Sequence, residues 1–161
     1  MTVTFGQPHR GFSLIELLVT LAILAVLASV AIPVAETAVQ RVKERDLRQA
    51  LREIRQAIDA YKQAVDDGLI SRGVDQSGFP PSLKTLVDGV PNAKSPVRQT
   101  LYFLRRIPHD PFADPAVPAE ISWGVRSYKS PPEAPAPGGD VYDIYSQSDR
   151  TGLNGIPYRQ W

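Results

Sequence analysis

An apolar segment lies near the N-terminus of the chain. From residue 12 to residue 35 the only ionisable side chain is that of Glu16, and residues 17–35 are apolar apart from Thr20 and Ser29. A hydroxyl on a helix can donate to a carbonyl one turn earlier, so neither residue prevents a helix in apolar surroundings. Residues 12–35 therefore predict a helix with roughly the 20 residues that cross a bilayer.

A second pattern follows in residues 36–67, where apolar positions recur at intervals of three and four. Such intervals place side chains on one face of an α-helix. The expected apolar stripe consists of Leu47, Leu51, Ile54, Ile58, Tyr61 and Val65. Charged residues fill the other faces, and Gly68 stands where a C-cap would end the helix. We expect the stripe to pack against the protein's own sheet.

Pro33 is the only interruption between the two patterns. Because proline removes a helical N–H and clashes with the preceding turn, we predict a kink or a locally melted turn at Pro33. The alternative is that Pro33 marks the end of a membrane span. With no other stop signal, one helix over residues 12–67 would be roughly 80 Å long.

The remaining residues, 68–161, predict a small head built from short elements, with many turns at its prolines. The expected elements are a short helix with Leu83, Leu86 and Val87 facing inward, a helical turn in 100–106, a half-buried strand in 121–126, a second strand in 141–146 and a third edge in 156–161. The predicted fold class is α+β, with a long N-terminal helix packed on a small antiparallel sheet.

Composition limits the chemistry that the chain can perform. The 161 residues carry a formal net charge of +1, which gives no sign of a nucleic-acid partner. The absence of cysteine excludes disulfides and thiolate metal sites, and two histidines leave little for a zinc site. Four carboxylates of the head, Asp110, Asp114, Asp140 and Asp143, are interpreted as solvated or turn-capping groups rather than an acid–base pair. We expect no catalytic residue.

A motif lies at the start of the apolar segment. It reads Gly11-Phe12-Ser13-Leu14-Ile15-Glu16-Leu17-Leu18-Val19. This segment resembles the type IV prepilin signature. The resemblance implies a pilin-like fold, a leader peptide over residues 1–11, cleavage after Gly11 by a membrane-embedded prepilin peptidase, and methylation of the new N-terminal amine of Phe12. It also implies that Glu16 is a hallmark residue of the family.

Glu16 is notable on physical grounds as well. A carboxylate inside a bilayer-spanning segment is costly and marks a functional site by default. No Lys or Arg lies in residues 12–35, so the expected partner is an N-terminal ammonium, its own or that of a neighbouring subunit. In the dry core of a filament this pair would set the axial register, and we therefore assign assembly to Glu16. The alternative is a side chain that only reaches back to the membrane interface.

Three later segments resemble the G-type (major) pseudopilin of the type II secretion system. They are residues 79–87, 102–112 and 142–146. Residues 113–139 depart from that pattern, and the closing loop, residues 147–155, is short. Many pilins close a C-terminal loop with a disulfide, which a chain without cysteine cannot form.

In G-type pseudopilins the closing loop binds calcium, so the resemblance raises a calcium site here. The candidate ligands are Asp149, Asn154 and Ser148, with Asp143 nearby. Calcium takes about six to eight oxygen ligands, and Asx and Ser residues in a loop with glycine are also ordinary turn formers. Both interpretations stay open: no cofactor, or calcium held by these residues.

The combined interpretation is a structural subunit and not an enzyme. It would be processed by prepilin peptidase and assembled into the helical filament of a type II secretion pseudopilus, which drives protein export. The alternative is a major or minor type IV pilin that serves adhesion, motility or DNA uptake. A signal-anchored enzyme or binding module is a third interpretation, against which the lack of a flexible linker argues.

The same interpretation predicts a single-pass protein of the bacterial inner membrane. Its parts would be the leader 1–11, the membrane and filament-core segment 12–35, the amphipathic segment 36–67, and the head 68–161 in the periplasm. The expected partners are further copies of the chain in a homo-oligomeric filament, minor pseudopilins, prepilin peptidase, the inner-membrane assembly platform and the membrane, with no nucleic acid.

Overall fold

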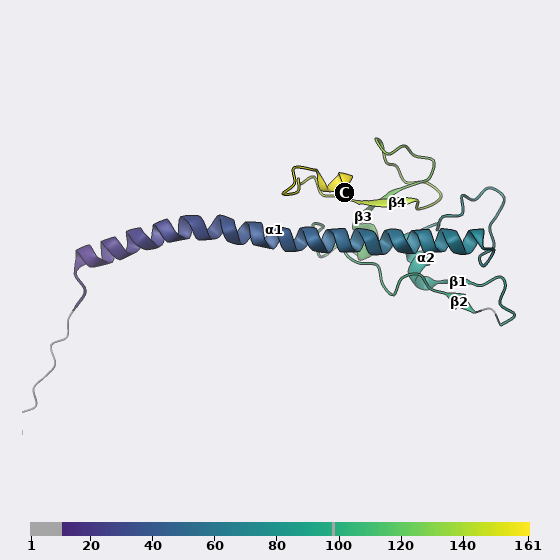
Figure 1. Cartoon of the computed structure of the whole chain (residues 1–161), viewed down its shortest axis with the longest axis horizontal. Coiled ribbons are helices and arrows are strands. Elements are labelled where there is room, and N and C mark those ends of the chain that lie inside the picture. Colours follow the sequence, from purple (N-terminus) through teal and green to yellow (C-terminus); the bar gives the residue numbers. More distant parts are fainter. Residues whose placement is uncertain (1–10, 98) are drawn as a thin grey trace, which may run out of the picture. The chain divides into compact units, whose positions relative to one another are not determined.

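The computed structural model describes residues 11–97 and 99–161, so most of the expected leader peptide lies outside the described residues. The chain divides into two compact units, Met1–Val39 and Gln40–Trp161. Helix α1, Leu14–Asp66, contributes residues to both units (Figure 1). The predicted fold class is confirmed: the protein is α+β, with a long N-terminal helix and small antiparallel sheets.

The start of α1 is fixed by Ser13. Its hydroxyl oxygen accepts a hydrogen bond from the backbone N–H of Glu16 at 3.2 Å, and the spacing Ser-x-x-Glu is that of a capping box. Further along, Thr20 donates to the Leu17 carbonyl at 2.9 Å. This bond confirms that a hydroxyl in the apolar segment is satisfied by its own helix.

The helix α1 continues through Pro33. Thr37, one turn later, donates its hydroxyl to the carbonyl of Pro33 at 2.8 Å. Such a bond to the carbonyl four residues earlier is the usual one for a threonine inside a helix. Because α1 is continuous through Pro33, the locally melted turn predicted there is wrong, and a kink at this position stays a prediction.

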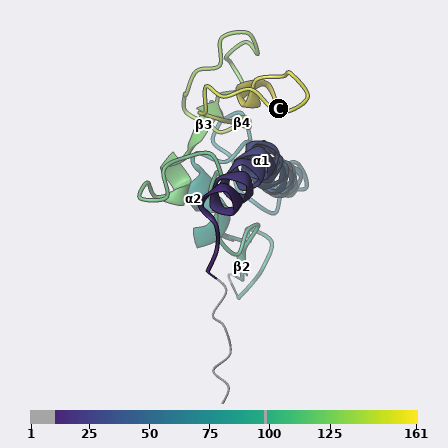
Figure 2. The same ribbon diagram turned by 90° about the vertical axis from the view of Figure 1, so that its left-hand side faces the viewer.

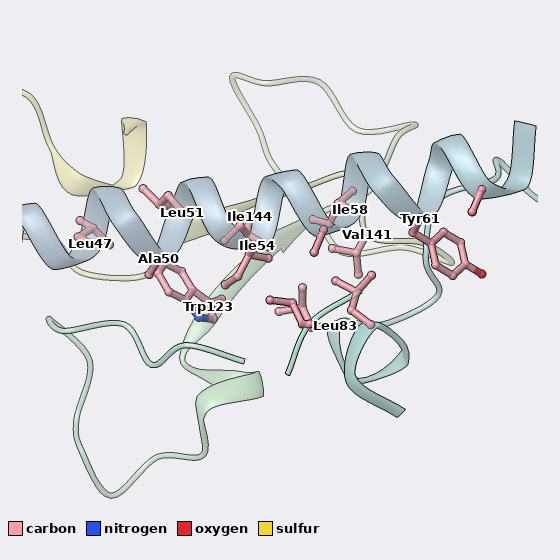
Figure 3. Packing of buried hydrophobic residues seen from close by; sticks show 14 of the residues in the cluster. Leu47, Ala50, Leu51, Ile54, Ile58, Tyr61, Leu83, Trp123, Val141 and Ile144 are labelled. Atoms are coloured by element: carbon pink, nitrogen blue, oxygen red, sulfur yellow. The ribbon is translucent and has the colours of Figure 1, made fainter. Parts of the chain in front are cut away.

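Within the Gln40–Trp161 unit, the apolar stripe of α1 is buried as predicted. All six residues of the stripe, Leu47, Leu51, Ile54, Ile58, Tyr61 and Val65, are at most 8% exposed. Figure 3 shows Leu47, Ile54 and Ile58 on one side of the helix, with Trp123 and Ile144 near them. Sequence periodicity therefore located the main core-forming face of the head.

The end of α1 follows the cap expected from Gly68. This residue has a φ of 69°, which glycine adopts without strain. Its N–H donates to the Val65 carbonyl at 2.9 Å, and the N–H of Leu69 donates to the Ala64 carbonyl at 2.8 Å. This pair of bonds is a Schellman motif, which satisfies the last carbonyls of the helix.

The described residues of the head form two separate two-stranded sheets, where the sequence predicted one. Strand β1, Val90–Pro91, pairs with β2, Thr100–Leu101, and β3, Trp123–Arg126, pairs with β4, Asp143–Ser146; both pairs are antiparallel. Helix α2, Leu83–Asp88, is the predicted short helix. Figure 2 shows β3 and β4 side by side, next to the C-terminal segment. The strands β3 and β4 confirm the two predicted strands, with slightly later starts.

Two local predictions were wrong. Residues 100–101 form β2 in place of a helical turn, because they pair with β1, and the chain then binds the Leu86 carbonyl through the N–H groups of Phe103 and Leu104. Residues 156–161 form no third strand. Pro157 has no N–H to donate to a sheet, and the chain instead makes one bridge to Thr151 and enters the 3₁₀-helix η2, Tyr158–Gln160.

The contact between β3 and β4 depends on a glycine. Gly124 pairs with Tyr145 across the sheet. A Cβ atom at position 124 would lie 2.2 Å from the ring of Tyr145. The Tyr145 ring thus packs directly on the backbone of Gly124. Such packing compensates for the weak tendency of glycine to form a strand.

Candidate functional site

The Gly11–Phe12 junction lies in non-helical chain just ahead of α1. The Phe12 side chain is 76% exposed, and a Cβ placed on Gly11 would have no atom within 4 Å. An exposed and uncrowded bond is accessible to a peptidase. Cleavage after Gly11 and methylation of Phe12 stay predictions.

Glu16 occupies the first turn of α1. A negative charge is favoured there by the helix dipole and by the free N–H groups of the first turn. Within residues 11–97 and 99–161, no ion pair involves Glu16. The carboxylate is therefore available to a cation supplied from elsewhere, as the assembly hypothesis requires.

The apolar segment presents its side chains outward. Its large apolar residues include Leu14, Leu18, Leu21, Leu27 and Val34, and each of these is more than half exposed. The segment is long and apolar enough to cross a membrane. A surface of this kind requires lipid or other apolar protein as its surroundings.

Residues 7–32 match the family model of the prokaryotic N-terminal methylation motif, and the match includes the Gly11–Phe12 junction and Glu16. The chain carries a type IV pilin-like prepilin signal. The prepilin motif accounts for the N-terminal segment alone, and no curated protein and no solved structure matched the chain. The motif does not distinguish a secretion pseudopilin from a pilus subunit.

The Gln40–Trp161 unit contains a second polar site, centred on a buried carboxylate of α1. Glu44 is 4% exposed. Its Oε1 accepts hydrogen bonds from the N–H of Leu153 at 2.7 Å, from the hydroxyl of Tyr158 at 3.0 Å and from Nε2 of Gln40 at 3.3 Å. Its Oε2 lies 3.6 Å from the Arg48 guanidinium. We call Gln40, Glu44, Leu153 and Tyr158 the head latch, because they join the closing loop to α1.

Tyr158 anchors the latch in the core. Its side chain is fully buried, and its ring stacks on Phe112 with a centroid distance of 4.0 Å. Burial is the main cause that raises the pKa of the Tyr158 hydroxyl; the hydrogen bond from Gln40 opposes this rise, and the Glu44 carboxylate adds to it. The hydroxyl thus remains a donor to Glu44 over the ordinary pH range.

A second tie joins α1 to β4. Nε of Arg55 donates to Asp143 at 2.8 Å, and its NH2 group donates to the carbonyls of Ile144 and Trp161 at 3.1 and 2.8 Å. Arg126 lies 3.4 Å from the other oxygen of Asp143. One carboxylate therefore serves two guanidinium groups and orders the strand beside the helix.

The residues predicted as calcium ligands fit that role poorly in this arrangement. Asp143 is engaged by Arg55 and Arg126. The side-chain oxygens of Ser148 and Asn154 each accept an N–H two residues ahead, from Arg150 and Ile156, which is turn chemistry. Across the described ranges, no group of three His, Cys, Asp or Glu residues could hold a metal ion. Calcium at Asp149 stays a prediction of the family resemblance.

The other head carboxylates cap turns, as the sequence interpretation expected. Asp110 is 1% exposed and accepts from the N–H of Phe112 at 2.8 Å and from the hydroxyl of Ser146 at 2.6 Å. Asp114 accepts from the N–H of Ala116 at 2.9 Å. These bonds hold the local backbone conformation.

Asp140 holds the Pro-rich connection in the same way, accepting from the N–H of Tyr128 at 2.9 Å. Burial would raise the pKa of Asp140, but hydrogen bonds from Ser77, from the Tyr128 N–H and from Ser127 together hold that pKa below its usual value. The ionised carboxylate is therefore part of the folded state.

The sequence interpretation missed the head latch. Glu44 was not singled out, yet it lies three residues before Leu47 and seven before Leu51. That spacing continues the apolar stripe by one turn. A charged residue at a stripe position is a signal for a buried carboxylate with partners, and Tyr158, which gave no periodic signal, supplies one of them.

Proposed function

We propose that the chain is a structural subunit of a type II secretion pseudopilus. It is made as a prepilin, cleaved after Gly11 by prepilin peptidase and N-methylated on Phe12. It then leaves the inner membrane through an assembly platform to join a helical filament with further copies and minor pseudopilins. Assembly of this filament drives protein export, and the head lies in the periplasm.

One observation carries this proposal. The methylation motif covers an accessible junction that is followed directly by a helix with an exposed apolar surface and a single carboxylate, Glu16. An apolar helix with one charge near its start is suited to a bundle of parallel copies. In such a bundle the Phe12 amine of one copy can pair with Glu16 of another, since a buried carboxylate needs a partner.

The choice of a secretion pseudopilus over a pilus rests on the head. Residues 79–87, 102–112 and 142–146 resemble G-type pseudopilins, and the chain lacks the cysteines with which many pilins close their C-terminal loop. In this chain the head latch closes the loop through Glu44.

Two measurements test the proposal. Intact mass of the protein from its native membrane should show a chain that starts at a methylated Phe12; a start beyond Ala31 would contradict the filament assignment. Deletion of the gene should then abolish export of a secreted protein and leave pili intact. Loss of pili with normal export would assign the chain to a pilus instead.

A further inference from the structure

Five arginines share one face of α1 in the Gln40–Trp161 unit. They follow one another at intervals of four, three, four and three residues, which places them in a row along the helix. The row, called here the arginine stripe, consists of Arg41, Arg45, Arg48, Arg52 and Arg55. The stripe lies on a different face from the buried apolar stripe, because the two sets of intervals are offset along the same helix.

Two members of the stripe have partners within the head. Arg55 is paired with Asp143. Arg48 lies over the ring of Trp161, 4.3 Å from its centroid, and 3.6 Å from Glu44. These contacts explain why arginine occurs at these two positions.

The other three members have no such explanation. Arg41, Arg45 and Arg52 are exposed, and among the described residues no ion pair or side-chain hydrogen bond involves them. Elsewhere the chain does pair helical charges four residues apart, as in Lys62 with Asp66. The lack of intramolecular partners is therefore specific to these three arginines of α1.

The positive charges of the arginine stripe also repel one another. Arg41 and Arg45 are four residues apart, as are Arg48 and Arg52, and like charges at this spacing destabilise a helix. Glu44 is buried in the head latch and lies near Arg48 alone among the stripe arginines. Within the described residues, the exposed acids Asp46 and Glu53 make no ion pair with the stripe. An external anion would relieve this repulsion.

We propose that the arginine stripe binds the phosphate groups of anionic phospholipids in the membrane that holds the apolar segment. Arg41 follows residue 35 by six residues, so even a fully extended chain keeps it within about 22 Å of the end of that segment. Guanidinium groups bind phosphate through two parallel hydrogen bonds. Basic clusters beside a membrane span are attracted to anionic headgroups. The stripe thus holds the head at the membrane surface before assembly.

The inference rests on the membrane-anchored part of the proposed function and is tested without a filament. The full chain is inserted, one copy per disc, into lipid nanodiscs of phosphatidylcholine alone or with one third phosphatidylglycerol. Arginine modification by phenylglyoxal is then followed residue by residue with mass spectrometry. Arg41, Arg45 and Arg52 should react about fivefold more slowly in the anionic discs, while Arg72 and Arg106 react equally in both.

A matched pair of variants supplies the second readout. Quenching of tryptophan fluorescence by a headgroup nitroxide should increase with phosphatidylglycerol in the unaltered chain, and this increase should be lost in Arg41→Gln/Arg45→Gln/Arg52→Gln. It should persist in Arg72→Gln/Arg105→Gln/Arg106→Gln, which removes the same charge from other exposed positions.

Equal reaction rates of Arg41, Arg45 and Arg52 in the two lipids would overturn the proposal. So would an increase in quenching with phosphatidylglycerol that persists in Arg41→Gln/Arg45→Gln/Arg52→Gln. Neither result would affect the filament assignment, because single chains in discs cannot assemble.

Discussion

The head latch makes a quantitative prediction about Glu44. Glu44→Ala leaves the Tyr158 hydroxyl and the Leu153 N–H without their acceptor, and the Tyr158 side chain is fully buried. A buried donor without a partner costs about 1–3 kcal/mol. Allowing for partial relaxation and for the lost bond from Gln40, we expect the free energy of unfolding to fall by about 3–5 kcal/mol.

Two milder variants separate charge from hydrogen bonding. Glu44→Gln keeps one acceptor oxygen and should cost about 1–2 kcal/mol, and Tyr158→Phe should cost about 1 kcal/mol. The double variant should show a coupling energy of about 1 kcal/mol between the two positions, because they share one bond. Denaturant unfolding of a soluble fragment that starts at Glu36 measures each value. Glu53→Gln, an exposed carboxylate on the same helix, is the control and should change stability by less than about 0.5 kcal/mol.

The latch also predicts a pH dependence. The pKa of Tyr158 is raised above that of an unfolded tyrosine, mainly by burial. The contribution of the Tyr158 hydroxyl to the free energy of unfolding is therefore complete below the unfolded pKa of about 10. It is lost as the pH rises through the folded pKa. Stability should fall above pH 10, and less steeply in Tyr158→Phe.

The Glu44→Ala measurement decides whether the latch exists. If this variant lowers the free energy of unfolding by less than about 1 kcal/mol, the value of a surface ion pair, the latch is refuted.

Four further outcomes are expected. Ile58→Ala should lower the free energy of unfolding of the same fragment by about 2–5 kcal/mol through loss of buried methyl groups, and a loss under half a kcal/mol would show that the position is not core. Gly124→Ala should cost about 1–3 kcal/mol because its Cβ overlaps the Tyr145 ring. If calcium binds, chelator should lower the Tm of the fragment and Asp149→Ala should remove that effect; equal Tm values with calcium and chelator would falsify the calcium prediction. Glu16→Leu should leave insertion and cleavage intact but abolish filament assembly, and normal assembly with normal export would reduce Glu16 to a side chain at the interface.

Sequence periodicity was sufficient for the elements whose side chains meet a single large surface. The stripe through Ile54 was predicted correctly because six apolar positions repeat on one helix face, and Trp123 and Ile144 follow the alternation of half-buried strands. The α+β class follows from these elements. Strands β1 and β2, by contrast, have two residues each, too few to carry a period.

The rest depended on contacts between distant residues. Glu44 and Tyr158 are 114 positions apart, and nothing local to either residue predicts their bond. Residues 156–161 showed apolar and aromatic character suited to a strand, but Pro157 and the packing of Tyr158 on Phe112 favour a 3₁₀ turn. The N-terminal motif around Gly11 and Glu16, by contrast, consists of residues that are neighbours in the sequence. The sequence alone was therefore sufficient to find it, and the family match at residues 7–32 agrees with it.

The exposed side chains of the apolar segment have a consequence for how a subunit could change its surroundings. Residues such as Leu18 and Leu27 are more than half exposed in the described chain. Transfer of this segment from lipid into a bundle of identical helices therefore breaks no internal packing, and both environments are equally apolar. The hydrophobic effect has little preference between them. If the chain assembles as proposed, the direction of transfer is decided by the few polar groups that prefer one environment. The single carboxylate of the segment, Glu16, would then determine whether a subunit stays in the membrane or joins the filament.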